Sequence, residues 1–235
     1  MLNPAAPARR NRRPSRGISL VEMMVGIAIG LIIVAAASLM VAGQLADNRR
    51  LLLETQIQQD LRAAAELMTR ELRRAGYWRD VHRSTAASAE LLGRLQNPYS
   101  AMTPSFSEGG STLVSFGYAD RERTENNAVD DDEQLGFRLN GTVIESQLGR
   151  GNWQALTDPA VMRVTGFSVA PRLQEVVLEC ALACSAGATI CPPRQQLRSY
   201  QVEIQAEAVH DSRVQRSIRT LVRVRNDLIV GECRD

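Results

Sequence analysis

The fold is decided by the stretch "RGISLVEMMVGIAIGLIIVAAASLMVAGQLADNRRLLLETQIQQDLRAAAELMTRELRRAG", residues 16–76. Residues 23–46 carry no charge, and as a helix they would be about 36 Å long at about 1.5 Å per residue. The hydrocarbon core of a bilayer is about 30 Å thick, so this segment can span it. A cleaved secretory signal is the alternative, and the small residues at 35–38 would suit its cleavage site. We favour a membrane anchor because the tract is too long for such a signal and its helical pattern continues past residue 46.

The second half of the stretch has the pattern of an amphipathic helix. Apolar residues recur in steps of three and four at Leu53, Ile57, Leu61, Ala64, Met68 and Leu72. These positions form one stripe on a helix, with charged and polar residues between them. Arg73 and Arg74 followed by Gly76 are typical of a helix end, where cations meet the negative pole and glycine adopts a left-handed conformation. The pattern predicts one helix over residues 18–75.

The rest of the chain is predicted to form an antiparallel sheet. Residues 84–110 are rich in small polar residues and indicate an irregular connection, with a helical turn at 90–95. Alternation with period two then predicts strands at 111–119, at 135–146 as a hairpin turning at Asn140-Gly141, and at 161–170, 199–209 and 213–226. In the last segment Val214, Arg216, Ile218, Thr220, Val222 and Val224 share one face, which is interrupted by the charge of Arg216. A long helix packed on a C-terminal antiparallel sheet is an α+β fold.

Charge is distributed unevenly along the chain. All 28 basic residues are arginines, and the formal net charge is +2. Residues 1–17 hold five of these arginines and no acid, which leaves 23 basic and 26 acidic residues, a net charge of about −3, for the remainder. A body of that charge is not expected to bind nucleic acid. The basic N-terminal segment is expected to stay in the cytoplasm, which places the C-terminal domain on the other side of the membrane.

The stretch "RGISLVEMMVGIAIGLIIVAAASLMVAG" resembles the class III signal of type IV pilins and type II secretion pseudopilins. In that family a basic leader ends in glycine, a prepilin peptidase cuts after it, the new N-terminus is methylated, and a glutamate stands at its fifth position. The resemblance implies cleavage between Gly17 and Ile18, methylation of Ile18, and Glu22 as the fifth-position glutamate. The usual first residue of the mature protein is phenylalanine, so isoleucine is a departure from the pattern.

Further segments resemble minor pilins of the PilW type. They are "DLRAAAELMTRELRRAGYW" (60–78), "GSTLVSFGYAD" (110–120), "WQALTDPAVMRVTGFSV" (153–169) and "RTLVRVRN" (219–226). The resemblance implies the type IV pilin-like fold and a non-enzymatic minor pilin that primes pilus assembly and sits at the pilus tip. Its partners would be other minor pilins, the major pilin, the prepilin peptidase and the inner-membrane assembly platform. The J-type minor pseudopilin of a type II secretion system has the same plan and is the near alternative.

These expectations divide the chain into four parts. Residues 1–17 are a cleaved leader, 18–46 the transmembrane and filament-core half of the helix, 47–76 its amphipathic half, and 77–235 a β-rich periplasmic domain. The precursor would cross the inner membrane once, and the mature protein would reach the pilus at the cell surface.

Glu22 needs an explanation because a charge at bilayer depth costs about 2.5–3.5 kcal/mol. In the family interpretation, the methylated amine of Ile18 in one subunit lies beside Glu22 of a neighbour, so that the two buried charges cancel. The alternative is a glutamate at the membrane interface. Gly26 and Gly30 form a G-x-x-x-G pattern that allows close helix packing, although glycine is common in membrane helices for other reasons.

The four cysteines are predicted to form disulfides, because the domain is expected outside the cytoplasm. They are Cys180, Cys184, Cys191 and Cys233, and three pairings are possible. We prefer Cys184 with Cys191, closing a short loop, and Cys180 with Cys233, fixing the tail; the sequence does not choose among the three. Zinc is the competing interpretation, but C-x3-C-x6-C lacks the usual C-x2-C knuckle and has no nearby histidine.

No motif indicates catalysis or a cofactor. The acidic run at 120–134 lacks the spacing of a calcium-binding EF-hand loop and predicts a solvated loop; its candidate ligands would be Asp130, Asp131, Asp132 and Glu133. His82 and His210 lie far apart, and hydrolase, zinc-protease and phosphate-loop motifs are missing from the sequence. We expect no metal, no cofactor and no enzymatic activity. A membrane-anchored periplasmic enzyme or binding domain is the distant alternative.

Overall fold

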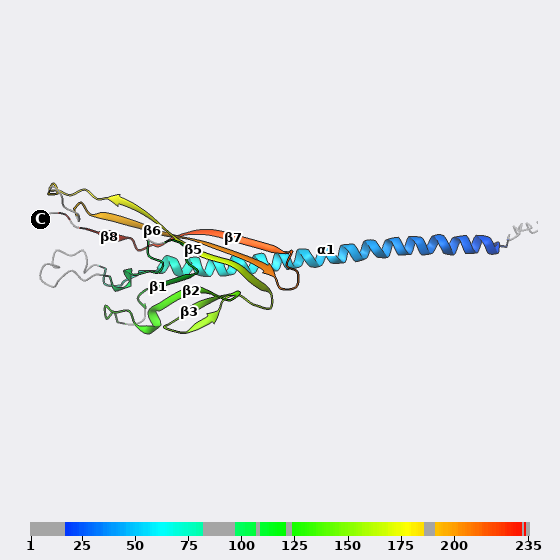
Figure 1. Cartoon of the computed structure of the whole chain (residues 1–235), viewed down its shortest axis with the longest axis horizontal. Helices are drawn as coiled ribbons and strands as arrows, with labels where there is room; N and C mark the ends of the chain where they lie inside the picture. The colour runs from blue at the N-terminus through cyan, green and yellow to red at the C-terminus, as the bar shows by residue number, and fades with distance from the viewer. Residues whose placement is uncertain are drawn as a thin grey trace, which may run out of the picture. The chain divides into compact units, whose positions relative to one another are not determined.

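The computed structural model describes residues 17–81, 97–106, 109–120, 124–185, 191–231 and 233. The chain forms two compact units, one ending at Arg49 and one beginning at Arg50. Helix α1 (Leu20–Arg74) contributes to both units (Figure 1). The predicted long helix is therefore confirmed, with ends that differ by one or two residues. The predicted helical turn at 90–95 lies outside the described residues.

In the first unit, α1 is a single apolar helix. Every residue from 17 to 49 is exposed. An 18-residue window of α1 has a mean hydropathy of 2.6, so by length and composition the helix is able to cross a membrane. A Cβ atom added at Gly26 or Gly30 would meet nothing within 4 Å. The two glycines therefore leave an open, shallow surface on this helix.

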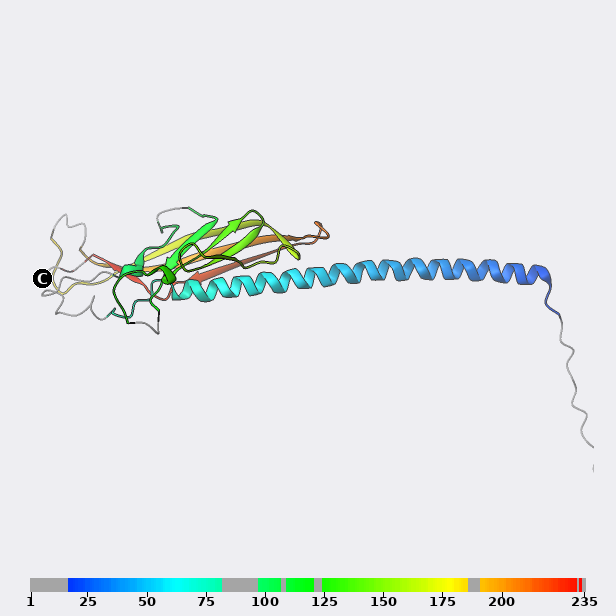
Figure 2. The ribbon, with the colours of Figure 1, turned by 90° about the horizontal axis from the view of Figure 1, so that it is seen from below.

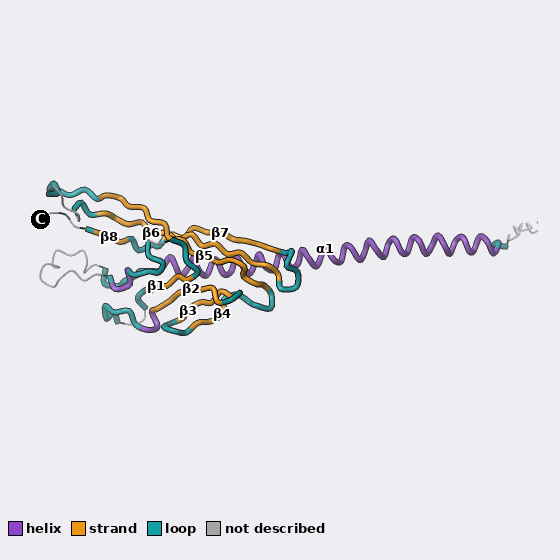
Figure 3. The backbone as a smooth tube through the Cα atoms, viewed as in Figure 1, coloured by secondary structure: helices purple, strands orange, loops and turns teal. Residues whose placement is uncertain are grey.

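In its described residues, the second unit contains two antiparallel sheets beside the end of α1 (Figure 3). The first has the order β1 (Leu113–Gly117), β2 (Gln134–Asn140), β3 (Val143–Leu148) and β4 (Trp153–Ala155). The second has the order β5 (Met162–Val177), β6 (Arg194–Ala208) and β7 (Gln215–Arg223), and β8 (Leu228–Val230) pairs with β6. The described parts of the connections include the short 3-10 helices η1 (Pro98–Ser100) and η2 (Asp131–Glu133).

The two sheets adjoin along β5 and cover one side of the helix. Ser111 and Val169 exchange two backbone hydrogen bonds of 3.0 and 2.8 Å, and the Val164 amide donates to the Thr142 carbonyl at 2.9 Å. Figure 2 shows both sheets on the same side of the final part of α1. The core between helix and sheets contains the predicted apolar stripe; its fully buried members on α1 are Ile57, Leu61, Met68 and Leu72. The predicted α+β fold, a long helix packed on antiparallel sheets, is thus confirmed.

Arg216, the charge that interrupts the apolar face of the last long strand, has a partner on the helix. It lies on β7, is half-buried, and its guanidinium donates to the Glu54 carboxylate of α1. Val222 and Val224, farther along the same face, are fully buried. The predicted face is therefore correct, and the helix neutralises the one charge on it.

The hairpin turn differs from the prediction by one residue. Asn140 pairs with Val143, so the two loop residues are Gly141 and Thr142 rather than Asn140 and Gly141. Gly141 has a φ of 60°, and glycine at the first central position is the arrangement of a type II′ turn. This turn requires a positive φ at one position, and Gly141 provides it. Asn140 can therefore remain in the strand, paired with Val143.

Strands β5 and β6 extend beyond their predicted limits. β5 continues to Val177 instead of 170, and β6 begins at Arg194 instead of 199. Together with β8, residues 172–177 and 194–197 form a three-stranded extension that we call the β8 ribbon. Residues 172–177 are all exposed. The alternation that marks a half-buried strand is therefore absent from the ribbon, which explains why the sequence did not predict it.

The helix ends as predicted, at a left-handed glycine. Gly76 has a φ of 72°, and its amide donates to the Gly117 carbonyl at 2.8 Å. The Asn226 side chain donates to the carbonyls of Ala75 and Arg74 at 2.9 and 3.3 Å. A residue near the C-terminus thus caps carbonyl groups that the last turn of α1 leaves free.

A buried arginine joins this helix end to the sheet. Arg198 of β6 is 3% exposed, and its guanidinium donates to the carbonyls of Ser100 and Asn226 at 2.9 and 2.7 Å. A Cβ atom at Gly76 would lie 3.2 Å from its Nη2 atom, so glycine is also needed there for close approach. Burial lowers the pKa of Arg198 below its usual range. Arg198 therefore links three segments that are distant in sequence.

Candidate membrane-anchor and assembly site

The N-terminal end of α1 carries the candidate processing site. Gly17 and Ile18 precede the helix, which begins at Leu20, and both are exposed. The bond between them is therefore in non-helical, accessible chain, as proteolysis requires. Glu22 lies in the first turn of α1, where the helix dipole favours a negative charge. The structure thus places all three predicted residues at the same end of one helix.

An unpartnered apolar surface follows Glu22 along the helix. The exposed large apolar residues from Val25 to Val34 are Val25, Ile27, Ile29, Leu31, Ile32, Ile33 and Val34, each more than half exposed. Soluble proteins rarely leave apolar patches of this extent uncovered. Glu22 is the only charged residue between Gly17 and Asp47. The first unit therefore requires lipid or other helices around it, and Glu22 is the group that such an environment must accommodate.

The cysteines pair in the preferred way. Cys184 and Cys191 form one disulfide across seven residues, and Cys180 and Cys233 form another across 53 residues. Their Cα atoms lie 5.6 and 5.5 Å apart, within the normal range for disulfides. The second disulfide connects the chain following β5 with the chain following β8. It therefore closes the end of the β8 ribbon.

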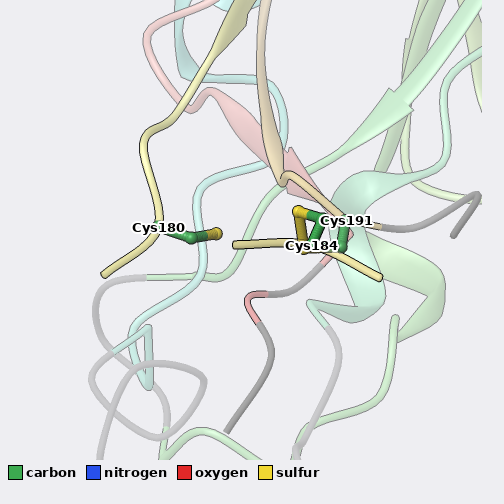
Figure 4. Close-up of side chains that lie close together, drawn as sticks. All are labelled: Cys180, Cys184 and Cys191. Carbon is green, nitrogen blue, oxygen red and sulfur yellow. A yellow bond between two sulfur atoms is a disulfide. The ribbon is translucent and has the colours of Figure 1, made fainter. Parts of the chain in front are cut away.

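The two disulfides are neighbours. The sulfur atoms of Cys180, Cys184 and Cys191 lie within 4.8 Å of one another, and Figure 4 shows Cys180 pointing toward the Cys184–Cys191 bond. Three thiolates at this separation could bind zinc if they were reduced. In the disulfide form these sulfurs bond to sulfur instead. The oxidation state of the cysteines therefore decides between the two interpretations.

We expect no free thiol in protein taken from the membrane of intact cells, because both disulfides would form in an oxidising compartment. Labelling with a maleimide after denaturation without reductant should modify none of the four cysteines. Labelling after reduction should modify all four and serves as the control. Stoichiometric labelling without reductant, or zinc bound to the purified chain, would contradict the prediction.

The acidic run is partly structural rather than wholly solvated, and this corrects the sequence interpretation. Glu133 is 8% exposed and accepts hydrogen bonds from the Tyr99 hydroxyl at 2.7 Å, the Asp120 amide at 2.9 Å and the Asp130 amide at 3.0 Å. Burial and the neighbouring Glu133 carboxylate raise the pKa of Tyr99 far above its usual value, so its hydroxyl remains a donor. A single glutamate thus holds the loop against η1.

Sequence reasoning missed Arg198, Tyr99 and Glu133. For Arg198 a signal was present, because it occupies the same strand face as the buried Tyr200, Val202 and Ile204. A charge at a core position of a strand indicates a buried polar contact. Tyr99 and Glu133 show no periodic pattern, since they lie in three-residue 3-10 helices within connections.

Comparison with known families agrees with both units. Residues 12–38 match the prokaryotic N-terminal methylation motif, a range that includes Gly17, Ile18 and Glu22. Residues 50–224, most of the chain, match the family described as prepilin peptidase-dependent protein B. Searches among curated proteins and among solved structures gave no match. The chain is therefore a membrane-anchored protein of the pilin type that belongs to the prepilin peptidase-dependent protein B family.

Proposed function

We propose that this protein is a minor pilin of the PilW type, which primes assembly of a type IV pilus together with other minor pilins and sits at the pilus tip. The observation that carries the proposal is the position of Glu22, five residues after Gly17 in a helix that is otherwise uncharged as far as residue 46. A carboxylate in such a segment is costly in lipid alone. A neighbouring subunit with a free N-terminal amine would supply its counter-charge.

The processing steps follow from the same residues. Prepilin peptidase would cut between Gly17 and Ile18 on the cytoplasmic side, where the five leader arginines hold the N-terminus. The second unit would lie in the periplasm, and its two disulfides support that placement. The apolar helix would then move from lipid into a bundle of subunit helices, where Gly26 and Gly30 permit close approach.

The proposed role is structural rather than enzymatic. The second unit would make contacts with other minor pilins, the major pilin and the assembly platform of the inner membrane. The runner-up function is that of a J-type minor pseudopilin, because the anchor and the α+β domain suit either system. A deletion mutant distinguishes them: loss of pili with normal protein secretion supports the proposal, and loss of secretion with normal pili supports the pseudopilin.

The mature protein is expected to begin at Ile18. Intact-mass measurement of the chain purified from membranes should show that residues 1–17 are missing and that the new N-terminus carries a methyl group. A strain without prepilin peptidase is the control, and there the leader should remain. An intact leader in the normal strain, or a mature chain that begins after Ala37, would refute cleavage as a pilin.

A further inference from the structure

A groove rich in arginine lies between the last turns of α1 and strand β7. It has a volume of about 530 Å³. Its lining residues are Glu66, Thr69, Arg70, Arg73 and Arg74 of the helix, with Thr220 of β7 and Arg225 beyond that strand. Four arginines and one glutamate give the lining a strong positive charge, in a chain whose body after the leader is slightly acidic. The charge of the groove is therefore a local feature.

Two of the four arginines have partners within the domain. Glu71 accepts from Arg70 Nε at 2.9 Å and lies 3.5 Å from Arg74 Nη1. Arg74 also lies over the ring of Tyr118, 4.1 Å from its centroid, and the Tyr118 hydroxyl donates to Glu71 at 2.7 Å. The charges of Arg70 and Arg74 are therefore already balanced by contacts within the domain.

Arg73 and Arg225 are not explained in this way. Both are exposed, and in the part of the chain that the structure describes, no carboxylate lies within ion-pair distance of either side chain. The Arg225 amide donates to the Arg73 carbonyl at 3.2 Å, which holds the two backbones together. The negative pole of a helix C-terminus favours cations, which could account for Arg73. However, the Asn226 side chain already caps carbonyls at this helix end, and Arg225 belongs to another segment. Two like charges that line one groove favour an anion from outside.

The edge of β7 defines what kind of anion fits. Among the described strands β7 pairs with β6 alone, so its other edge has backbone groups that are not part of a ladder. Thr220 belongs to this strand and lines the groove. An extended peptide can add to such an edge through main-chain hydrogen bonds and place its side chains in adjoining pockets. A peptide with carboxylates could form main-chain hydrogen bonds with the edge of β7 and ion pairs with the arginines.

We propose that this groove binds an extended acidic segment of a neighbouring pilin-type subunit, whose main chain pairs with β7 and whose carboxylates contact Arg73 and Arg225. The inference rests on the proposed function, because it specifies the chemistry of one contact between this protein and a neighbouring subunit. A nucleic acid fits less well, because its phosphates need a broad basic surface and the rest of this body is slightly acidic. Arginine forms bidentate contacts with carboxylates, which gives the groove its selectivity.

The test is photo-cross-linking of the full-length protein in cells that assemble pili. Thr220 is replaced by a photoreactive phenylalanine analogue, and the adducts are identified by mass spectrometry. We expect an adduct with a second protein that carries an N-terminal methylation motif, through a peptide that contains several Asp or Glu residues. Combining Arg73→Glu with Arg225→Glu should lower the adduct yield by about tenfold or more, because attraction becomes repulsion.

Matched variants separate charge from folding. Arg73→Lys with Arg225→Lys keeps the charges and should retain about half of the yield or more. Arg172→Glu reverses an exposed arginine on β5, away from the groove, and should leave the yield unchanged. Resistance to protease tells whether each variant is folded. If the double glutamate variant fails to fold, Arg73→Gln with Arg225→Gln replaces it and should also lower the yield.

Four outcomes would overturn the inference: no adduct, an adduct with lipid or nucleic acid, an adduct through a peptide without carboxylates, or an unchanged yield after charge reversal. The mature N-terminus is measured in the same cells. A chain cut before Ile18 that gives one of these outcomes refutes the docking site and leaves the proposed function standing. A chain with its leader intact refutes the proposed function itself.

Discussion

Replacing Glu22 with alanine is expected to leave the protein in the membrane and to remove most of it from pili. The variant should insert at least as well as the normal precursor, because the apolar helix loses a charge. Cleavage should persist, since Gly17 and Ile18 are unchanged. Assembly should fail because the amine of the neighbouring subunit would enter the helix bundle without a counter-charge. Leaving one member of a buried ion pair alone costs about 3–5 kcal/mol.

The measurement is the ratio of this protein in sheared pili to that in membranes. Glu22→Gln should be nearly as deficient as Glu22→Ala, because it keeps the shape and loses the charge, whereas Glu22→Asp should be milder. Gln44→Ala is the matched control, since it removes an uncharged polar side chain from the same exposed helix. If the alanine and glutamine variants enter pili at the normal ratio, charge pairing is not the role of Glu22.

Arg198→Ala is expected to destabilise the second unit by about 3 kcal/mol. The substitution removes a buried side chain and leaves the carbonyls of Ser100 and Asn226 without their donor. Large-to-small changes in a core cost about 2–5 kcal/mol, and each buried group left unsatisfied adds about 1–3 kcal/mol, although relaxation offsets part of this. In a domain of this size the melting temperature should fall by roughly 6–12 °C.

Thermal unfolding of the full chain in detergent, followed by near-ultraviolet circular dichroism, measures the effect. Arg198→Met keeps much of the apolar stem and should be less destabilising than Arg198→Ala. Arg172→Ala, an exposed site on β5, should change the free energy of unfolding by less than about 0.5 kcal/mol. An Arg198→Ala variant that melts with the normal protein would show that these contacts do not stabilise the domain.

The helix could be predicted because its signals are local and repeated. An uncharged tract, a stripe in steps of three and four, and a glycine after two arginines each point to the same element. The candidate processing site could be predicted for the same reason, because Gly17, Ile18 and Glu22 lie within six consecutive residues. Strands that pack one face on the helix also showed their alternation, including the position of Arg216.

Features that depend on contacts distant in sequence could not be predicted. The β8 ribbon is exposed on β5, so it lacks the alternation that burial imposes. β8 is only three residues long, and its existence depends on pairing with the start of β6. Glu133 looked like part of a solvated run because the partner that buries it, Tyr99, lies in a connection of no regular pattern. The shift of the hairpin turn came from treating asparagine and glycine as equivalent turn residues.

The disulfide between Cys180 and Cys233 determines how the domain would bear mechanical tension. Among the described residues, β8 is joined to β6 by three residue pairs, and without a covalent link a pull on the C-terminus would separate these two strands. The disulfide closes a covalent loop that contains β6, β7 and β8. Tension applied between the two ends of the chain therefore passes from β5 through Cys180 directly to Cys233. The strands inside the loop are outside the covalent load path, so this tension cannot pull the chain between Cys180 and Cys233 into an extended form while the disulfide is intact.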